Sequence, residues 1–424
     1  MSILRALLGL VFFCVIAWLM SSRRDRFPWR VVVFGIAAQV FLGWAILRTT
    51  IGQQLFQGAA DLVFSLVGRA EPGARMVFGP LADQETLASV FGPENSFIFA
   101  FAGRGLVVII FFSALMGILY HLGIMQALIW VLAKVMSMLL GVSGAESMAM
   151  AANVFVGQTE APLVVKPYLA KMTRSELNAL MTGGFATIAG SVLVVYVSLL
   201  GEEYGPHLLT ASVMSAPAAF LIAKIMQPET EQAVTAGRVE YRVERSAHNL
   251  IEAAANGTSD GLKLWLNVIA MLIAFVALVS LVNWPLEWIG EQLDYAQGLS
   301  LGRIFGWVFA PVAWVMGVEG WSDCQGMGSL LGTKIAVNEF VAFTDLLTMT
   351  RDGVDSAALS PRSAKMAAYA LCGFANFSSV GIQIGGIAPL AEERRTDLAQ
   401  LALRAMLGGA FASWMTATVA GMFL

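Results

Sequence analysis

The sequence predicts an all-α, polytopic membrane protein with about eight transmembrane helices, two re-entrant hairpins in an inverted repeat, and interfacial helices. The first observation is composition: of 424 residues, 58% are hydrophobic and 13% are charged, about half the charged fraction of a soluble domain. The second is a series of apolar segments near the length of about 20 residues that a membrane helix needs. The third is a pair of apolar regions interrupted by Gly, Asn, Gln and Ser, which a lipid-exposed helix would not tolerate.

Eight apolar segments are predicted to cross the membrane. The first is interpreted as a retained helix and not as a signal peptide, because Arg5 alone forms its basic flank and no A-x-A site follows it. The predicted spans are residues 3–20, 31–47, 106–122, 177–200, 208–226, 262–282, 364–387 and 401–424.

Three further segments are predicted to lie along the membrane surface. Residues 51–68 keep Leu and Val near one face with Gln and Asp among them, a pattern typical of an interfacial helix. Residues 124–140 are apolar with only Lys134 among them, and residues 304–318 form the shortest of the later apolar segments. A loop is expected over residues 75–95, which contain Gly, Pro and acidic residues.

Basic residues predict the orientation. Arg23, Arg24, Arg26 and Arg30 lie between the first two spans, and the positive-inside rule puts this loop in the cytoplasm. Later loops alternate between basic and acidic, so we expect both termini outside. The Arg and Lys residues at 351, 362 and 365 fall on the outer side and depart from the rule.

The two interrupted regions, residues 141–167 and 317–343, begin internal repeats. By the predicted orientation the first copy starts inside and the second outside, so the repeats are inverted. Inverted repeats with polar-interrupted segments in corresponding places indicate a secondary transporter with its substrate near the bilayer midplane. The matched motifs are Gly141-Val142-Ser143-Gly144 with Gly317-Val318-Glu319-Gly320, Thr159-Glu160-Ala161 with Asn338-Glu339-Phe340, and Gly184-Phe185-Ala186-Thr187 with Gly373-Phe374-Ala375-Asn376.

Glu160 and Glu339 are the best-placed ionisable residues in these regions. An uncompensated intramembrane charge is costly, so such a residue indicates a functional site. The structural alternatives are that Glu160 caps the hairpin tip or satisfies backbone amides, and that Glu339 pairs with Lys334.

The motifs resemble the concentrative nucleoside transporter family, and most closely its shorter bacterial members. The first set is Gly157-Gln158-Thr159-Glu160-Ala161-Pro162, preceded by Glu146-Ser147-Met148 and Ala152-Asn153. The second set is Lys334, Asn338-Glu339-Phe340-Val341-Ala342 and Gly373-Phe374-Ala375-Asn376-Phe377-Ser378-Ser379. The resemblance covers nearly the whole chain.

This resemblance implies a homotrimer in which each protomer has a scaffold domain and a mobile transport domain. Residues 1–122 would form scaffold helices, 123–227 the first transport repeat, 228–300 a loop and scaffold helix, and 301–424 the second transport repeat. It further implies that the first hairpin contacts the nucleobase through Gln158, Thr159 and Glu160, with Val192 packing against the base. Ribose would be bound by Glu339, Asn376 and Ser379, with Phe374 as either a stacking partner or a core residue.

The resemblance also implies a sodium site made by the side chains of Asn153 and Thr187 and the carbonyls of Val156 and Ile188. Sodium is a hard cation that prefers oxygen ligands, and unwound backbone near broken helices supplies them. The structural alternative for Asn153 is to hold the hairpin turn. For Asn376 and Ser379 it is to hydrogen-bond between helices.

The expected function is sodium-coupled import of a nucleoside such as uridine by an elevator-type mechanism in the bacterial inner membrane. Carboxylates and amides suit a neutral, hydrogen-bonding solute, and with only Lys334 basic in these motifs a phosphate is disfavoured. Proton coupling or another small polar solute are the alternatives. No enzyme motif is present, and the net charge of −3 indicates no nucleic-acid partner.

Overall fold

The computed structural model describes residues 3–83, 86–87, 89, 105–237, 247–293, 298–350 and 359–424. Within these residues the regular structure is helical throughout, and no strand is present. The all-α class is therefore confirmed. Four helices are long and apolar enough to cross a membrane, and six spans result if each of two bent helix pairs is counted as one.

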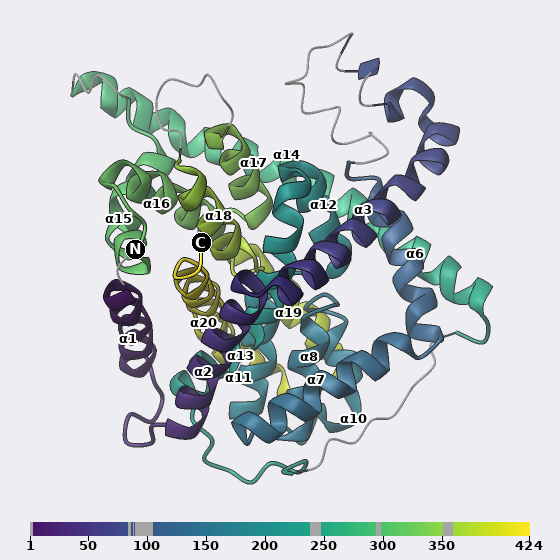
Figure 1. Cartoon of the computed structure of the whole chain (residues 1–424), viewed down its shortest axis with the longest axis vertical. Coiled ribbons are helices and arrows are strands. Elements are labelled where there is room, and N and C mark those ends of the chain that lie inside the picture. Colours follow the sequence, from purple (N-terminus) through teal and green to yellow (C-terminus); the bar gives the residue numbers. More distant parts are fainter. Residues whose placement is uncertain are drawn as a thin grey trace.

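The N-terminal part consists of α1 (Ile3–Leu19), α2 (Trp29–Arg48) and α3 (Thr50–Phe78), with α3 crossing the face of the molecule in Figure 1. The α3 helix is longer than the expected interfacial segment, and a short 3-10 turn, η1 (Gly79–Ala82), follows it. The loop expected from residue 75 therefore begins later. An i,i+4 ion pair between Glu71 and Arg75, at 2.8 Å, supports this last turn.

Two sharp bends mark the entrances of the repeats. The helices α6 (Val108–His121) and α7 (Ile124–Leu140) meet at 75°, and α15 (Leu301–Met316) and α16 (Trp321–Ala336) meet at 111°. Glycines at the bends take positive φ: +81° at Gly123, +97° at Gly317 and +80° at Gly320. The bends separate residues 124–140 and 304–318 from the helices next to them. That these residues lie along the membrane surface stays a prediction.

Each interrupted region forms a helical hairpin. The first contains α8 (Gly144–Asn153) and two short helices, α9 (Ala161–Val164) and α10 (Lys166–Leu169). The second is formed by α16 and α17 (Glu339–Thr350). Chain breaks therefore fall at corresponding places, next to Glu160 and at Glu339.

Two spans that were predicted as continuous helices are broken, which corrects the sequence interpretation. Residues 177–200 lie in α11 (Arg174–Ala186) and α12 (Gly190–Leu200), and residues 364–387 lie in α18 (Pro361–Leu371) and α19 (Phe377–Ile387). The backbone is extended at Thr187 and Asn376, the polar residues that end the matched Gly-Phe-Ala motifs. Apolar composition concealed the breaks, since it does not report backbone conformation.

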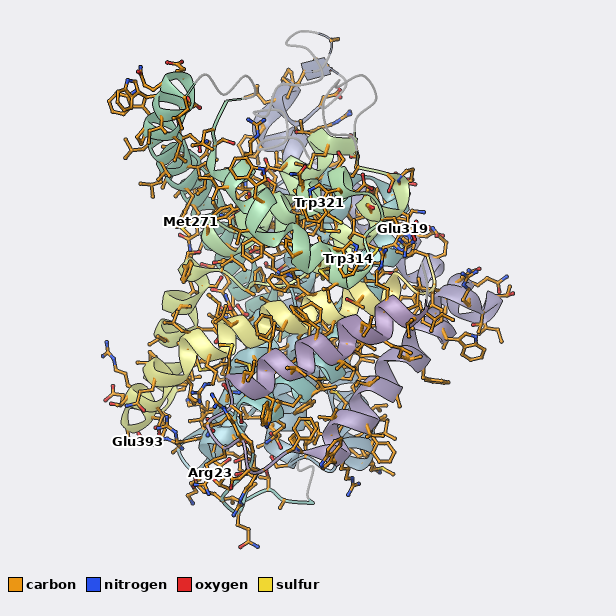
Figure 2. All side chains as sticks on the ribbon, turned by 90° about the vertical axis from the view of Figure 1, so that its left-hand side faces the viewer. Arg23, Met271, Trp314, Glu319, Trp321 and Glu393 are labelled. Atoms are coloured by element: carbon orange, nitrogen blue, oxygen red, sulfur yellow. The ribbon has the colours of Figure 1, made fainter. Side chains whose placement is uncertain are left out.

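The remaining elements are η2 (Glu202–Tyr204), α13 (Gly205–Met226), α14 (Leu250–Gln292), η3 (Ala388–Leu390), η4 (Glu392–Arg394) and α20 (Arg395–Ala420). At 43 residues, α14 is about twice as long as a membrane helix needs to be. Only 6% of its most apolar window is buried. Met271 of this helix lies at the edge of the molecule (Figure 2).

Contacts between helix ends agree with the prediction that successive loops lie alternately at the two ends of the molecule. At one end Ser22 N donates to Met226 O at 3.0 Å, and Arg174 pairs with Asp397. At the other end Arg5 donates to Val318 O at 3.1 Å. Figure 2 likewise places Arg23 and Glu393 at one end of the molecule, away from Glu319 and Trp321.

Arg362, which the predicted orientation puts on the outer side, binds two helix ends. Its guanidinium donates to the carbonyls of Gly317 at 3.3 Å and Gly421 at 2.6 Å, the residues that end α15 and α20. A cation at the C-terminal ends of two helices is favourable because their terminal carbonyls are otherwise unsatisfied. This arginine therefore has a structural reason to depart from the orientation rule.

Candidate functional site

In the first repeat, the break that follows α8 lies against the break between α11 and α12. Gly190 N, which begins α12, donates to Phe155 O just beyond the end of α8 at 2.9 Å. Any side chain at Gly190 would crowd that carbonyl, since a Cβ there would lie 3.0 Å from it. Two segments that lie outside the regular helices, residues 154–160 and 187–189, are thereby brought together.

All four residues expected to bind sodium lie at this junction. Asn153 is 1% exposed; its Nδ2 donates to Leu180 O at 3.4 Å, while its Oδ1 accepts no hydrogen bond from the described residues. Thr187 Oγ1 donates to Gly183 O at 2.9 Å, which leaves its oxygen lone pairs available. Val156 and Ile188 lie between helices, so their carbonyls are outside the helical ladders. An orphaned amide oxygen with nearby non-helical carbonyls suits a hard cation.

Glu339 is held by two donors from different elements. Tyr196 Oη in α12 donates to its Oε1 and Asn376 Nδ2 donates to its Oε2, both at 2.9 Å. Glu339 is 7% exposed and Tyr196 is 1% exposed. The Tyr196 ring packs on Phe343, with centroids 4.4 Å apart. This arrangement joins the first repeat to the second through one carboxylate.

Lys334 does not form the ion pair with Glu339 that was the structural alternative. Its Nζ donates to Ala370 O at 2.9 Å, and the ion pairs among the described residues do not include it. The carboxylate of Glu339 is therefore engaged by neutral donors.

Asn376 has two roles at the start of α19. Its Oδ1 accepts from Ser379 N at 2.8 Å and from Ser378 Oγ at 2.7 Å, while its Nδ2 binds Glu339. The first contact is an N-cap. Its amide is thus oriented by the helix that it caps. Ser379 is 3% exposed, and Phe374 is half-buried against the core.

The tip of the first hairpin faces α19. A Cβ placed on Gly386 of that helix would lie 2.7 Å from Thr159 Cγ2. Gln158 is buried, and its Oε1 accepts no hydrogen bond from the described residues. Glu160 is exposed at the tip and its side chain makes no capping hydrogen bond to α9. A Cβ on Gly157 would lie 2.2 Å from Glu160 Oε2, so the carboxylate lies beside the backbone of the tip. Its role in binding the base and the alternative that it satisfies backbone amides both stay predictions. Val192 is 8% exposed and lies one helical turn before Tyr196.

Two polar residues at the junction were missed in the sequence. One is Tyr196, a tyrosine within an otherwise apolar helix. The other is Gln383 of α19, which is 0% exposed: its Nε2 donates to Met181 O at 2.9 Å and its Oε1 has no described donor. Each is an isolated polar side chain in an apolar segment, and this pattern could have identified both residues as functional candidates from the sequence.

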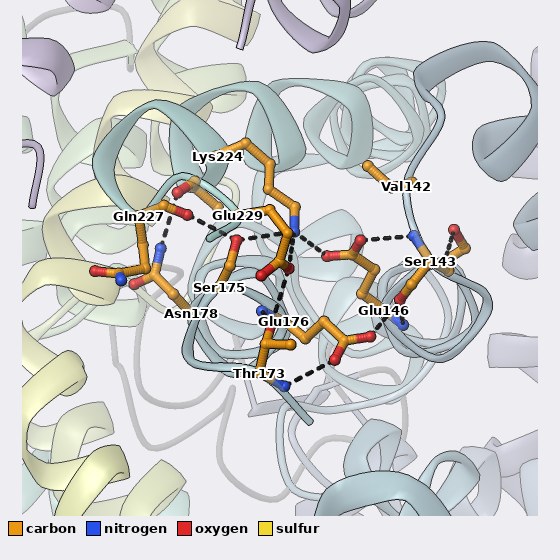
Figure 3. A network of polar contacts seen from close by, with 12 residues as sticks. Val142, Ser143, Glu146, Thr173, Ser175, Glu176, Asn178, Lys224, Gln227 and Glu229 are labelled. Carbon is orange, nitrogen blue, oxygen red and sulfur yellow. Dashed lines mark hydrogen bonds and ion pairs between the residues drawn. The ribbon is translucent and has the colours of Figure 1, made fainter. Parts of the chain in front are cut away.

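A second polar network lies at the other ends of α8 and α11 (Figure 3). Lys224, in the last turn of α13, is 2.6 Å from Glu146 Oε2 and donates to Ser175 Oγ at 2.9 Å. Glu146 and Glu176 close capping boxes at the first turns of α8 and α11. Ser143 Oγ of the first box donates to Glu176 Oε1 of the second at 2.5 Å.

Three charges in this network sit at the favourable end of a helix dipole: Glu146 and Glu176 occupy N-terminal turns, and Lys224 occupies a C-terminal turn. A third glutamate, Glu229, lies beyond α13 with its Oε2 3.6 Å from Lys224 Nζ. Glu146 therefore has a structural role at the entrance of the first hairpin. The network, here called the hairpin clamp (Ser143, Glu146, Ser175, Glu176 and Lys224), fixes the start of the first hairpin against α11 and α13.

Family models match most of the chain. Residues 8–81 match the Na+ dependent nucleoside transporter N-terminus, residues 104–203 match a nucleoside recognition model, and residues 207–421 match the Na+ dependent nucleoside transporter C-terminus.

Curated relatives agree with these matches. An uncharacterized transporter of Haemophilus influenzae is 44% identical over 100% of this chain and 98% of its own length. Sodium/nucleoside cotransporter 1 of Rattus norvegicus is 40% identical over 98% of this chain. This chain spans 63% of that relative and 58% of the rat solute carrier family 28 member 3, which is 43% identical to it.

Solved structures share the fold. CNTnw in an inward-facing substrate-bound state is 39% identical, has a TM-score of 0.91, and is matched over 100% of this chain and 98% of its own. A CNTnw variant in the intermediate 2 state gives a TM-score of 0.93 at the same identity, with 100% and 99% covered. The chain therefore belongs to the Na+-dependent nucleoside transporter family, a family of membrane transporters and not of enzymes.

Proposed function

We propose that this protein imports nucleosides in symport with sodium, with Glu339 as the central substrate-binding residue. The observation that carries the proposal is the buried Glu339 carboxylate, held by Tyr196 and Asn376 where the two repeats meet. Such a carboxylate accepts hydrogen bonds from sugar hydroxyls with charge-assisted strength. Asn376 and Ser379 would share the ribose, since they begin the helix that faces Glu339.

The nucleobase would be read by the first hairpin. Gln158 and Gln383 each have a buried amide oxygen without a described donor, and a Cβ on Gly184 would contact both side chains. Amide groups give and accept hydrogen bonds, as the edges of a base require. Thr159 and Glu160 at the tip would complete the contacts, with Val192 packing against the ring. Phe374 would contribute an apolar surface.

Sodium would bind at Asn153, Val156, Thr187 and Ile188. The orphaned Asn153 Oδ1 supports this, because a buried oxygen without a donor is costly unless a cation or donor fills the place. The family relationship and the similarity to sodium/nucleoside cotransporter 1 of Rattus norvegicus favour sodium over a proton.

Uridine uptake into proteoliposomes, with and without a sodium gradient, tests the coupling. We expect sodium to stimulate uptake in the wild type and Asn153→Ala to abolish that stimulation. Asn178→Ala is the matched control, since Asn178 is a fully buried amide within α11. Its Nδ2 donates to Ala223 O at 3.1 Å and, as in Asn153, its Oδ1 accepts no hydrogen bond from the described residues. Unchanged sodium dependence in Asn153→Ala would exclude this ion site, and stimulation by a proton gradient alone would favour proton coupling.

The family resemblance further supports a homotrimer in the bacterial inner membrane. The bacterial relatives from Haemophilus influenzae and Bacillus subtilis are matched over 98% and 100% of their lengths. The exposed apolar length of α14 offers surface for neighbouring protomers as well as lipid. The mass of the detergent-solubilised particle, corrected for detergent, is expected to be three times the 45.4 kDa of the chain.

A further inference from the structure

One turn of α11, residues 180–184, ends in two consecutive glycines. Gly183 and Gly184 are both buried within this helix. Glycine inside a helix is destabilising relative to alanine, because it loses more backbone freedom on folding. The neighbours of each glycine show what this turn accommodates.

Gly183 faces the proposed sodium site. A Cβ on Gly183 would lie 3.2 Å from Asn153 Nδ2 and 2.6 Å from Met150 Sδ. Asn153 Nδ2 donates to Leu180 O at 3.4 Å, and Thr187 Oγ1 donates to Gly183 O at 2.9 Å. Two of the four proposed sodium ligands therefore hydrogen-bond to this turn.

Gly184 faces the residues proposed to read the base. A Cβ on Gly184 would overlap Gln383 Nε2 and would lie 2.9 Å from Gln158 Cβ. Gln383 is 0% exposed, and its Nε2 donates to Met181 O at 2.9 Å. Consecutive carbonyls of α11, those of Leu180 and Met181, therefore each accept a hydrogen bond from an amide of a different proposed site.

The two amides also share an unsatisfied oxygen. Asn153 Oδ1 and Gln383 Oε1 are both buried, and neither accepts a hydrogen bond within the described part of the chain. A buried oxygen without a partner is costly, so each amide is satisfied only when a ligand arrives or when the amide moves. With both sites empty, two amides that rest on the same turn are therefore not held in place by their oxygens.

We propose that this turn couples sodium binding to nucleobase binding, with Gln383 carrying the coupling on the base side; the inference rests on the proposed sodium and nucleobase sites. A sodium ion on Asn153 Oδ1 holds that amide against Leu180 O and orders the turn. The nucleobase then meets a Gln383 amide that Met181 O already holds, so its binding costs less ordering. Sodium and nucleoside strengthen each other's binding by the same factor, as linkage requires.

The test is the uridine dissociation constant, measured by isothermal titration calorimetry on the purified protein at saturating and at low sodium. The ratio of the two constants is the coupling factor. Gln383→Met keeps the length of the side chain and removes its amide. We expect it to lower the coupling factor by about two- to tenfold, the contribution of one hydrogen bond. A contact with the base alone would instead raise both constants equally.

Gln39→Met is the matched control. Gln39 in α2 is also 0% exposed, its Nε2 donates to a carbonyl, Met214 O at 3.2 Å, and its Oε1 has no donor among the residues that the structure describes. This variant removes the same kind of side chain from a place away from α11. Its coupling factor should equal that of the wild type.

Uridine dissociation constants that rise by the same factor at both sodium concentrations in Gln383→Met would overturn the inference and leave the proposed function intact. A wild type whose uridine binding does not change with sodium would defeat the proposed sodium coupling and this inference with it. If Gln383→Met does not fold, Gln383→Asn decides, since it keeps the amide but is too short by one methylene to reach Met181 O. A wild-type coupling factor in Gln383→Asn would overturn the inference.

Discussion

Tyr196 orients the carboxylate of Glu339, which we propose binds the substrate. Its hydroxyl donates to one carboxylate oxygen while its ring packs on Phe343. The Tyr196→Phe substitution keeps the ring and removes only the donor. A hydrogen bond to a charged group contributes about 1.5–3 kcal/mol, so we expect the KM for uridine to rise roughly tenfold or more.

A matched variant separates the loss of this hydrogen bond from the general effect of removing a buried tyrosine hydroxyl. Tyr369 is also fully buried and its Oη lies 3.1 Å from His207 Nδ1, away from Glu339. Tyr369→Phe should therefore leave the uridine KM near that of the wild type. Equal KM values for Tyr196→Phe and the wild type would show that the Tyr196 hydroxyl does not orient the Glu339 carboxylate for substrate binding.

At the scale of elements, the hairpin clamp positions the two helices whose opposite ends form the proposed sodium site. Lys224 is 4% exposed and Glu146 is 2% exposed. Removing one partner of a buried ion pair costs about 3–5 kcal/mol because the other charge stays buried and uncompensated. We expect Lys224→Met to lower the free energy of unfolding by that amount, measured by thermal melting in detergent.

Two controls test whether the uncompensated charge of Glu146 causes the loss of stability. Lys224→Met/Glu146→Gln removes the uncompensated charge and should recover part of the loss. Lys263→Met removes a lysine from an exposed pair with Asp260 and should change stability little. A Lys224→Met protein as stable as the wild type would show that the clamp does not hold the hairpin.

The break between α18 and α19 depends on one glycine. Gly373 has φ +148°, and a Cβ there would lie 2.7 Å from Phe185 O in the break region of the first repeat. We expect Gly373→Ala to destabilise the protein by about 1–3 kcal/mol, because the two backbones can no longer approach. Gly381→Ala in α19 is the control, since no atom lies within 4 Å of its added Cβ. Similar melting temperatures for the two variants would contradict this account.

At the scale of the whole molecule, the interface between α2 and α13 tests the proposed elevator motion. Gln39 in α2 donates to Met214 O in α13 at 3.2 Å and to Thr416 Oγ1 in α20 at 3.1 Å. These contacts join the predicted scaffold, residues 1–122, to both predicted transport repeats. They would have to break if the repeats move as a unit.

A disulfide across this interface should stop transport. A Cβ on Gly35 would lie 3.2 Å from Leu221 Cβ, close to the spacing that a disulfide needs. Oxidised Gly35→Cys/Leu221→Cys protein is expected to lose uridine uptake and to regain it on reduction, with the single variants as controls. The native cysteines Cys14, Cys324 and Cys372 are free and buried. Full uptake by completely crosslinked protein would count against motion at this interface.

The sequence by itself determined the membrane class, the inverted repeat, the hairpins and the tip glutamates. Those features are carried by composition and by motifs within single elements, because each segment partitions between lipid and water according to its own residues. Glu339 was found in this way and Asn376 through the family resemblance, and the structure brings the two within hydrogen-bonding distance.

Only the tertiary structure decided which side chains meet. Tyr196 reaches Glu339 across 143 positions of sequence, Lys334 turns to Ala370 instead of Glu339, and Lys224 pairs with Glu146. The breaks within residues 177–200 and 364–387 also appear only in the fold. The physical reason is that hydropathy reports what surrounds a helix, whereas polar pairing depends on how helices distant in sequence pack together.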